Sequence, residues 1–309
     1  MGIVYRAHDE HLNRNVAIKI LPQDSLADDT SRQRFRKEAH ALSKLNHPNV
    51  ASVFDFDSEG GVDFLVEELI PGTSLDEKLL SRPLSERQIV SLGSQLCEGL
   101  ASAHEQQIIH RDLKPGNLRI TPDDRLKILD FGLAKVLHAA NLAKDTDVTE
   151  SFTEPEHVSG MLPYMAPEQL LNENLDTRTD IWSVGCVLYE MATGQRPFAG
   201  TGVALADLIL HQQPTNPSKL NHRISLGLEA IILQCLEKDP ARRYASAREI
   251  AVDLHRLDTG TLTRALAARR RALLRRATPI VALLSYLSLA ARCGTGCIAR
   301  RPLPPAVER

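Results

Sequence analysis

The sequence predicts an α+β fold, with strands in most of the first seventy residues and helices in most of the rest. Val16-Ala17-Ile18-Lys19 alternates in the manner of a strand, and two further strand-like runs, 51–57 and 62–68, flank the turn-forming pair Gly60-Gly61. Residues 28–46 carry apolar side chains at helical spacing, which predicts one helix beside these strands. The helices expected farther on are 85–106, as two helices, 181–193 and 247–257.

Length and charge divide the chain further. It has 309 residues, 43% of them hydrophobic, enough to bury the core of one large domain or of two lobes. Residues 260–309 hold ten Arg and one Glu, a charge of +9. Since the net charge of the chain is −2, residues 1–259 carry a charge of −11. An acidic body argues against a nucleic-acid-binding core, and a basic tail suits an anionic surface such as a membrane. We expect a small part at 1–69, a large part at 70–258 and a tail at 259–309.

The cysteines favour a reducing compartment. Cys97, Cys186 and Cys235 lie singly in apolar helical stretches, where buried free thiols are expected. Cys293 and Cys297 have no His or further Cys at ligand spacing, which argues against a zinc site. The N-terminus runs straight into polar and charged sequence without a secretory signal, so we expect a cytoplasmic location.

One stretch holds side chains suited to moving a phosphoryl group. His110-Arg111-Asp112-Leu113-Lys114-Pro115-Gly116-Asn117 is followed, thirteen residues after its Asn, by Asp130-Phe131-Gly132. Asp112 can orient a hydroxyl and accept its proton, and Lys114 can neutralise charge on the phosphate. Asn117 and Asp130 offer the hard oxygen ligands that Mg²⁺ prefers. Any one of these residues alone would be uninformative, but the whole set at this spacing is very improbable by chance.

These motifs resemble those of the bacterial serine/threonine protein kinases of the eukaryotic-like type, from residue 1 to about residue 258. The resemblance implies a two-lobed fold, with a small, mostly antiparallel β lobe holding one key helix and a large, mainly helical lobe. It implies transfer of the γ-phosphoryl group of ATP to Ser or Thr hydroxyls of protein substrates, with ATP and Mg²⁺ as cofactors. Self-association for autophosphorylation is a further expectation, and no nucleic-acid partner is expected.

The resemblance also assigns roles to single residues. The catalytic residues would be Asp112, Lys114 and Asn117, and the metal ligands Asn117 and Asp130. The nucleotide-binding residues would be Gly2, Val4, Ala17, Lys19, Glu38, Glu68, Leu118 and Asp130. A Lys19–Glu38 ion pair would hold the ammonium against the phosphates. A hydrophobic spine would contain Leu42, Val53, His110 and Phe131, anchored by Asp180, and Arg243 would pair with Glu168.

Several positions depart from the family pattern. Gly2 and Val4 match only the last Gly and the Val of the glycine-rich loop, so the roof over the phosphates is incomplete in this chain. Two explanations stay open, a start assigned too far downstream and a weakened enzyme, and we favour the first. Arg119 stands where many relatives have Leu, and its aliphatic stem is expected to cover the adenine ring.

Two further departures bear on activity. Glu67 stands where the family has an apolar residue behind the adenine pocket, and a buried carboxylate needs either a partner, with Lys19 nearest, or a raised pKa. Met161 replaces a Thr whose hydroxyl normally bonds to the catalytic Asp and Lys. Losing such a bond costs about 1.5–3 kcal/mol.

Regulation by phosphorylation is expected from Arg111. A buried cation beside Asp112 requires an anion, which in similar kinases is a phosphate on the activation loop. That loop spans 133–165, and the candidate acceptors are Thr146, Thr149, Ser151 and Thr153.

The tail leaves two interpretations open. Residues 264–276 hold six arginines, and 277–291 are free of charge over a length that is short for a membrane span. A marginal span or interfacial anchor within 264–291 and an ordinary soluble or disordered tail are equally compatible with this pattern.

For the whole chain, the alternative to an enzyme is a pseudokinase that serves as a binding or scaffold module. It draws on the incomplete glycine loop, Glu67 and Met161, whereas the retained metal- and proton-handling residues argue against it.

Overall fold

The structure is a computed structural model, and it describes residues 3–21, 29–80, 84–131 and 160–258. The chain separates into two units, Met1–Gly260 and Thr261–Arg309, of which the second lies outside the described residues. The expectations for Gly2, for residues 132–159 and for the tail likewise fall outside them.

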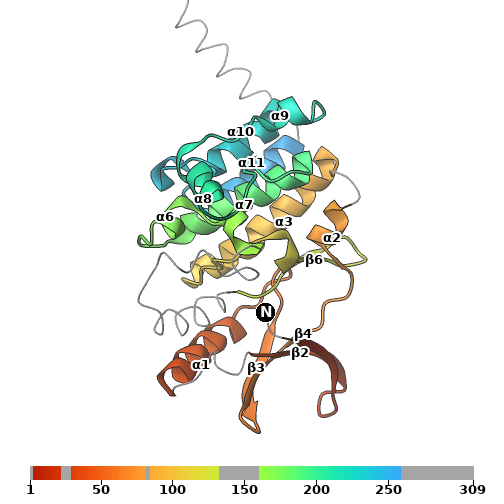
Figure 1. Cartoon of the computed structure of the whole chain (residues 1–309). Coiled ribbons are helices and arrows are strands. Elements are labelled where there is room, and N and C mark those ends of the chain that lie inside the picture. Colours follow the sequence, from red (N-terminus) through yellow and green to blue (C-terminus); the bar gives the residue numbers. More distant parts are fainter. Residues whose placement is uncertain (1–2, 22–28, 81–83, 132–159, 259–309) are drawn as a thin grey trace, which may run out of the picture. The chain divides into compact units, whose positions relative to one another are not determined.

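The first part of the chain forms a four-stranded antiparallel sheet with the order β1-β2-β4-β3 (Figure 1). Its strands are β1 (Val4–Asp9), β2 (Arg14–Ile20), β3 (Val53–Glu59) and β4 (Val62–Glu68). The register places Lys19 opposite Leu65 and Ala17 opposite Glu67, so β2 and β4 are neighbours across the sheet. β3 begins two residues later than expected, and its pairing with β4 is shifted between Val53 and Asp55.

One helix, α1 (Asp29–Ser43), accompanies this sheet, as the sequence predicts. Phe35 on α1 is fully buried, and its ring lies 4.8 Å from the ring of Phe56 on β3. This contact joins the apolar face of the helix to the sheet.

The prediction of two helices within 85–106 was wrong, because α3 (Glu86–Glu105) is one continuous helix of 20 residues. Its glycines permit close packing and do not break it. A Cβ on Gly93 would lie 2.8 Å from a methyl of Leu188, and one on Gly99 would lie 2.8 Å from a methyl of Ile128. The missing side chains let other elements approach α3 at these two points.

The larger part of the chain is mainly helical and packs around α7 (Thr177–Thr193) (Figure 1). α7 begins one turn earlier than expected, at an N-cap where Asp176 accepts the Arg178 N–H, and it ends at Gly194, whose φ is 71°. The other helices are α2 (Leu75–Leu79), α6 (Pro167–Leu170), α8 (Gly202–His211), α9 (Pro217–Leu220), α10 (Leu226–Cys235) and α11 (Ala247–Asp258). The described residues also contain the 3₁₀ segments η1 (Pro115–Asn117), η3 (Leu162–Tyr164) and η4 (Pro240–Arg242).

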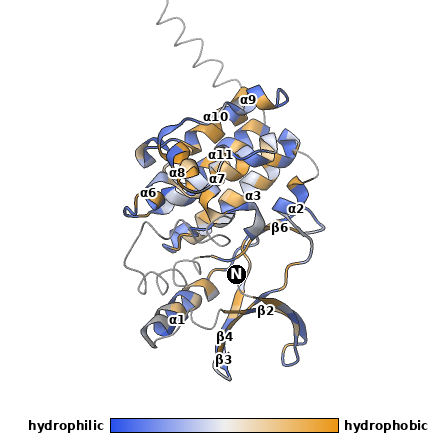
Figure 2. Cartoon of the chain, viewed as in Figure 1, coloured by the Kyte–Doolittle hydropathy of each residue, from blue (hydrophilic) through white to orange (hydrophobic). Residues whose placement is uncertain are grey.

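Apolar residues concentrate on the helices in the middle of this part, around α7 and α3 (Figure 2). Trp182 on α7 is fully buried, and its ring stacks on that of Phe198 at 6.0 Å. Cys97, Cys186 and Cys235 are buried free thiols, as expected, and burial raises the pKa of each thiol. Inert thiols of this kind act as core side chains.

A second, three-stranded sheet has the order β5-β6-β7, with β5 (Thr73–Ser74), β6 (Leu118–Ile120) and β7 (Leu126–Ile128). Asn117 directly precedes β6, and Asp130 follows β7 by two residues. An isolated parallel bridge joins Val50 to Ile128. The β6–β7 hairpin therefore brings together two residues that stand thirteen apart in the sequence.

Candidate active site

Asp180, on the first turn of α7, holds the start of the catalytic loop His110–Asn117. Its carboxylate is fully buried and accepts the backbone N–H of His110 at 2.8 Å and of Arg111 at 2.9 Å. Nε2 of His104 lies 2.7 Å from the same carboxylate. Although burial alone would raise it, the pKa of Asp180 is lowered, because His104 and the backbone N–H groups stabilise the charged form. The expectation that Asp180 anchors this loop is confirmed.

Two residues of the site adopt left-handed backbone conformations that are uncommon outside glycine. Arg111 has a φ of 67° and Asp130 a φ of 60°. Such conformations cost free energy and persist where the surroundings hold them, as the two bonds to Asp180 hold Arg111. The Asp130 carboxylate accepts a hydrogen bond from Lys19 on β2.

Asp112, Lys114 and Asn117 form one cluster in the catalytic loop. Nζ of Lys114 donates to the two carboxylate oxygens of Asp112 at 2.8 and 3.1 Å. Nδ2 of Asn117 donates to the carbonyl oxygen of Asp112 at 2.7 Å and to its carboxylate at 3.2 Å. Because Asn117 uses its amide nitrogen in these bonds, its amide oxygen remains available as a ligand.

Lys19 on β2 reaches the catalytic half of the site. Its Nζ donates to Oδ1 of Asp130 at 2.5 Å, and the Lys19 side chain is only 13% exposed. This ion pair joins the four-stranded sheet to the segment after β7. The predicted partner of Lys19, Glu38, lies half-buried on α1, and the Lys19–Glu38 ion pair stays a prediction.

The donor set suits a hard divalent cation. Asn117 could offer an amide oxygen and Asp130 its second carboxylate oxygen, both ligand types that Mg²⁺ accepts. Among the described residues, no group of three or more His, Cys, Asp or Glu side chains could hold a metal ion. A cation here would therefore need phosphate oxygens and water to complete its coordination, as is usual for Mg²⁺ at phosphoryl-transfer sites.

The four residues expected in a hydrophobic spine are Leu42, Val53, His110 and Phe131. The His110 and Phe131 rings lie 4.7 Å apart and are both buried. Leu42 is buried and Val53 half-buried. Nε2 of His110 also lies 2.9 Å from the Leu129 carbonyl oxygen, so this ring is a packed structural element and is not positioned as a base.

Two alternatives are expected for Glu67 on β4, a charged partner such as Lys19 or a raised pKa, and the structure distinguishes between them. Lys19 pairs with Asp130, and within the described part of the chain the Glu67 side chain has no hydrogen bond or ion pair. The pKa of Glu67 is raised to about 7, mainly by burial and also by the negative charge of Asp130, while Lys19 opposes the rise. The carboxyl thus follows the second expectation, a raised pKa, and it leaves Lys19 to Asp130.

The residues expected to surround the adenine base of a nucleotide differ in their exposure to solvent. Ala17 and Leu118 are buried, whereas Val4 on the outer strand is 58% exposed. The carboxylate of Glu68 is bound by Lys127 at 2.8 and 3.0 Å, so its contribution to a nucleotide would come from its backbone. Arg119 uses its guanidinium to donate to the carbonyl oxygen of Gly72 at 2.7 Å.

The Glu168–Arg243 pair has a structural role, as expected. Two parallel bonds of 2.7 and 2.8 Å join the guanidinium to the carboxylate, and both residues are buried. Glu168 is the second residue of α6, which is separated from the end of η3 by two residues. Met161 lies just before η3, with no hydroxyl to offer Asp112 or Lys114.

Two residues of the site were missed by sequence reasoning. His104 lies six residues before the catalytic loop, and its bond to Asp180 depends on the packing of α3 against α7. Lys127 alternates with buried Leu126 and Ile128 on β7. That alternation could have indicated a lysine directed at a partner, but it could not have identified Glu68.

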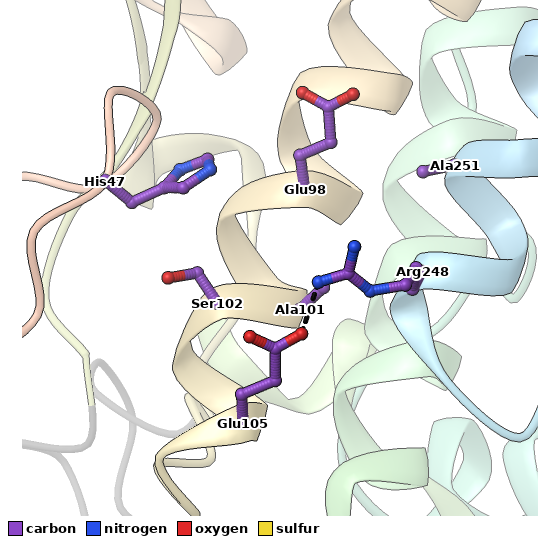
Figure 3. Close-up of a pocket in the computed structure, with 7 residues that line it drawn as sticks. All are labelled: His47, Glu98, Ala101, Ser102, Glu105, Arg248 and Ala251. Carbon is purple, nitrogen blue, oxygen red and sulfur yellow. Dashed lines mark hydrogen bonds and ion pairs between the residues drawn. The ribbon is translucent and has the colours of Figure 1, made fainter.

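A separate pocket of about 220 Å³ lies between α3, α11 and the segment after α1 (Figure 3). Its polar lining residues are His47, Glu98, Ser102, Glu105 and Arg248. Glu105 pairs with Arg248, which ties α3 to α11. None of the proposed catalytic residues lines this pocket, so it is distinct from the candidate active site.

With this geometry in view, the chain can be placed among known proteins. The protein kinase domain family matches residues 1–253, and the chain belongs to this family. The chain is 35% identical over 266 residues to serine/threonine-protein kinase PknB of Mycobacterium leprae, an alignment that covers 84% of this chain and 41% of the relative. It is 39% identical over 268 residues to serine/threonine-protein kinase pkn3 of Myxococcus xanthus, covering 84% and 48%.

Solved structures support the fold. The kinase domain of Mycobacterium tuberculosis PknI superposes with a TM-score of 0.64 at 22% identity, covering 82% of this chain and 90% of that one. The two-lobed α+β fold expected from the sequence is confirmed. This chain spans less than half the length of the curated relatives above. Within the described residues, no helix is long and apolar enough to cross a membrane.

Proposed function

We propose that this chain is an ATP-dependent serine/threonine protein kinase. The observation that carries the proposal is the convergence of Lys19 and Asp130 with the Asp112, Lys114 and Asn117 cluster. The relatives named serine/threonine-protein kinase support the same activity, and no comparison favours a scaffold without catalysis. The substrates would be proteins that present a Ser or Thr hydroxyl.

The residues of the chain divide the work of phosphoryl transfer. Asp112 accepts a hydrogen bond from the substrate hydroxyl, orients the oxygen and takes its proton as the new bond forms. Lys114 bonds to Asp112 in the free protein and can turn to a phosphate oxygen, where it neutralises developing charge. Lys19 would bind the nucleotide phosphates, and Asp130 keeps its ammonium close to the site.

Mg²⁺ is the proposed metal, held by the oxygens of Asn117 and Asp130. When bound, it would neutralise phosphate charge. Val4, Ala17 and Leu118 would contact the base, with Gly2 over the phosphates and Glu38 paired with Lys19. The Gly2 assignment lies outside the described residues.

Transfer of ³²P from γ-labelled ATP to a generic protein substrate tests the proposal. We expect incorporation by the wild type with Mg²⁺, and a loss of at least roughly 100-fold in Asp112→Asn, which removes the proton acceptor. Asp207→Asn, an exposed change on α8, is the matched control and should retain activity. Equal incorporation by wild type and Asp112→Asn, or none by either, would favour the scaffold alternative.

Arg111 supports a second element of the proposal, phosphorylation of the activation loop. Its Nε is buried and has no hydrogen-bond partner in the described part of the chain, so a nearby anion would be stabilised. The candidate acceptors Thr146, Thr149, Ser151 and Thr153 lie outside the described residues. Mass spectrometry of ATP-treated protein should find at least one of them phosphorylated, and finding none would contradict this element.

The partners and location extend the same proposal. We place the kinase part in the cytoplasm, with self-association bringing one activation loop to another copy's active site. A membrane contact through 264–291 is the third expectation, on residues that the structure does not describe. Detergent-free fractionation tests it, because complete recovery in the soluble fraction would exclude an anchor.

A further inference from the structure

Two cations on neighbouring strands hold the two ends of the segment that follows β4. The segment Glu68–Gly72, called here the link, connects β4 to β5. Lys127 on β7 binds its first residue and Arg119 on β6 binds its last. Arg119 and Lys127 are directly paired across the β6–β7 hairpin, so both bonds originate from one small unit.

Lys127 has all its donors engaged. Its Nζ lies 2.8 and 3.0 Å from the carboxylate oxygens of Glu68 and 3.2 Å from the carbonyl oxygen of Val50. An ammonium has three N–H donors, so this set satisfies it completely. The Lys127 side chain is 12% exposed, which reduces the screening of the pair by water.

Glu68 extends the connection to a second segment. Its carboxylate accepts the Ser52 N–H at 3.1 Å, while its own backbone N–H donates to the Ser52 carbonyl at 2.9 Å. Lys127 therefore joins β7, the start of the link and the segment that leads into β3. A residue that joins three segments limits their relative movement more than an isolated surface pair does.

The far end of the link depends on a close backbone approach. Gly72 has a φ of 113°, and a Cβ on it would lie 2.0 Å from the carbonyl oxygen of Ile120. Only glycine fits there, and the approach places the Gly72 carbonyl 2.7 Å from Nη2 of Arg119. The Arg119 side chain thus holds the end of the link by this hydrogen bond.

The same hairpin determines where the proposed metal ligands stand. Asn117 precedes β6 and Asp130 follows β7, and the Leu129 N–H donates to the Asn117 carbonyl at 2.8 Å. We propose that Lys127 and Arg119 are positioning residues for nucleotide binding, which fix the link relative to Asn117 and Asp130. This inference rests on the proposed function, because it is a nucleotide that would extend from the link to those two ligands.

The consequence is specific. Neither residue handles the proton of the substrate hydroxyl, so their loss should weaken nucleotide binding and leave the transfer step nearly unchanged at saturating ATP. The affinity should fall because a loosened link must be ordered again when the nucleotide binds.

The test uses the full chain and two measurements on the same variants. Lys127→Met removes the ammonium and keeps the stem, and Lys127→Arg keeps the charge. Lys219→Met is the matched control, since Lys219 is exposed on α9 and lies outside the β6–β7 hairpin. Calorimetry gives the Kd for ATP with Mg²⁺, and hydrogen exchange without nucleotide reports the protection of the Leu69 and Ile70 amides.

We expect Lys127→Met to raise the Kd roughly 5- to 30-fold and to speed exchange in the link. Lys127→Arg should restore most of the affinity for ATP and most of the protection of the link. The double variant Lys127→Met with Glu68→Gln should bind ATP no more weakly than Lys127→Met alone. Arg119→Met provides a second variant if Lys127→Met does not fold.

Three outcomes would overturn the inference. A Kd and an exchange rate equal to those of Lys219→Met would mean that the Lys127 ammonium contributes neither to nucleotide binding nor to the order of the link. Faster exchange with an unchanged Kd would reduce the two cations to structural residues. Failure of the wild type to bind nucleotide would overturn the proposed function itself, and the positioning role with it, so the two failures are distinguishable.

Discussion

Glu67 provides the sharpest test of the electrostatics of the site. Burial raises its pKa from 4.5 to about 7, so folding favours its protonated form. For an acid whose pKa is raised by folding, ionisation destabilises the folded state. This loss of stability is absent below the unfolded pKa, grows as the pH rises and is complete above the folded pKa. Glu67→Gln keeps the size and removes the titration, so it should stabilise the protein above pH 7 and have little effect near pH 5.

The magnitude follows from the shift. A change from 4.5 to about 7 corresponds to roughly 3 kcal/mol, at about 1.4 kcal/mol for each pH unit. Glu67 is partly exposed and interacts with Lys19 and Asp130, so we expect a gain of roughly 2 to 3 kcal/mol at pH 8 and less than about 1 kcal/mol at pH 5. In a domain of this size such a gain raises Tm by roughly 4 to 10 °C.

Urea unfolding at the two pH values gives the free energy of unfolding directly. Glu59→Gln, an exposed change at the end of β3, is the matched control and should shift it by less than about 0.5 kcal/mol at both. An equal gain for Glu67→Gln at pH 5 and pH 8, or a loss at pH 8, would refute the reasoning, because either result removes the link between the effect and ionisation.

Three other substitutions have expected outcomes. Arg243→Met should cost roughly 3 to 5 kcal/mol in urea unfolding, because Glu168 would stay buried without its partner, and adding Glu168→Gln should recover part of the loss. Asp180→Asn should weaken the catalytic loop and lower kcat for ³²P transfer. Since the pKa of Asp180 is lowered, its stabilising charge is present above the unfolded pKa and lost as the pH falls through the folded value, so this variant should also flatten the acid limb of the stability profile. Gly93→Ala should cost roughly 1 to 3 kcal/mol because its Cβ would lie 2.8 Å from Leu188, whereas Gly160→Ala, with open space around it, should be nearly neutral in the same unfolding assay.

The parts of the site that the sequence predicted best are contiguous in the chain. Asp112, Lys114 and Asn117 lie within six residues, so local backbone geometry alone brings them together. The long-range contacts of Asp180 with the loop, and of Glu168 with Arg243, came from the family resemblance, and the hydrogen bonds confirm them. Spacing within the sequence would not have paired these residues.

The features that the sequence could not predict depend on contacts between elements that lie far apart in the chain. Two helices were expected where the structure has the single helix α3, in which Gly93 and Gly99, residues that usually weaken a helix, are positions of close contact with other elements. The bonds of Lys127 and Arg119 to the link require the β6–β7 hairpin to lie beside it, and no periodicity in the sequence indicates this.

Glu67, which stands where the family has an apolar residue, changes the charge of the site but leaves the Lys19–Asp130 ion pair in place. Glu67 and Lys19 lie on neighbouring strands, yet Lys19 bonds to Asp130. With a pKa of about 7, Glu67 is partly protonated near neutral pH and competes weakly for the ammonium. Raising the pH adds one negative charge near Lys19 and Asp130, which should oppose the phosphates of a nucleotide. Nucleotide affinity should therefore fall from pH 6.5 to pH 8 in the wild type and change less in Glu67→Gln, a comparison that isothermal titration at the two pH values can make.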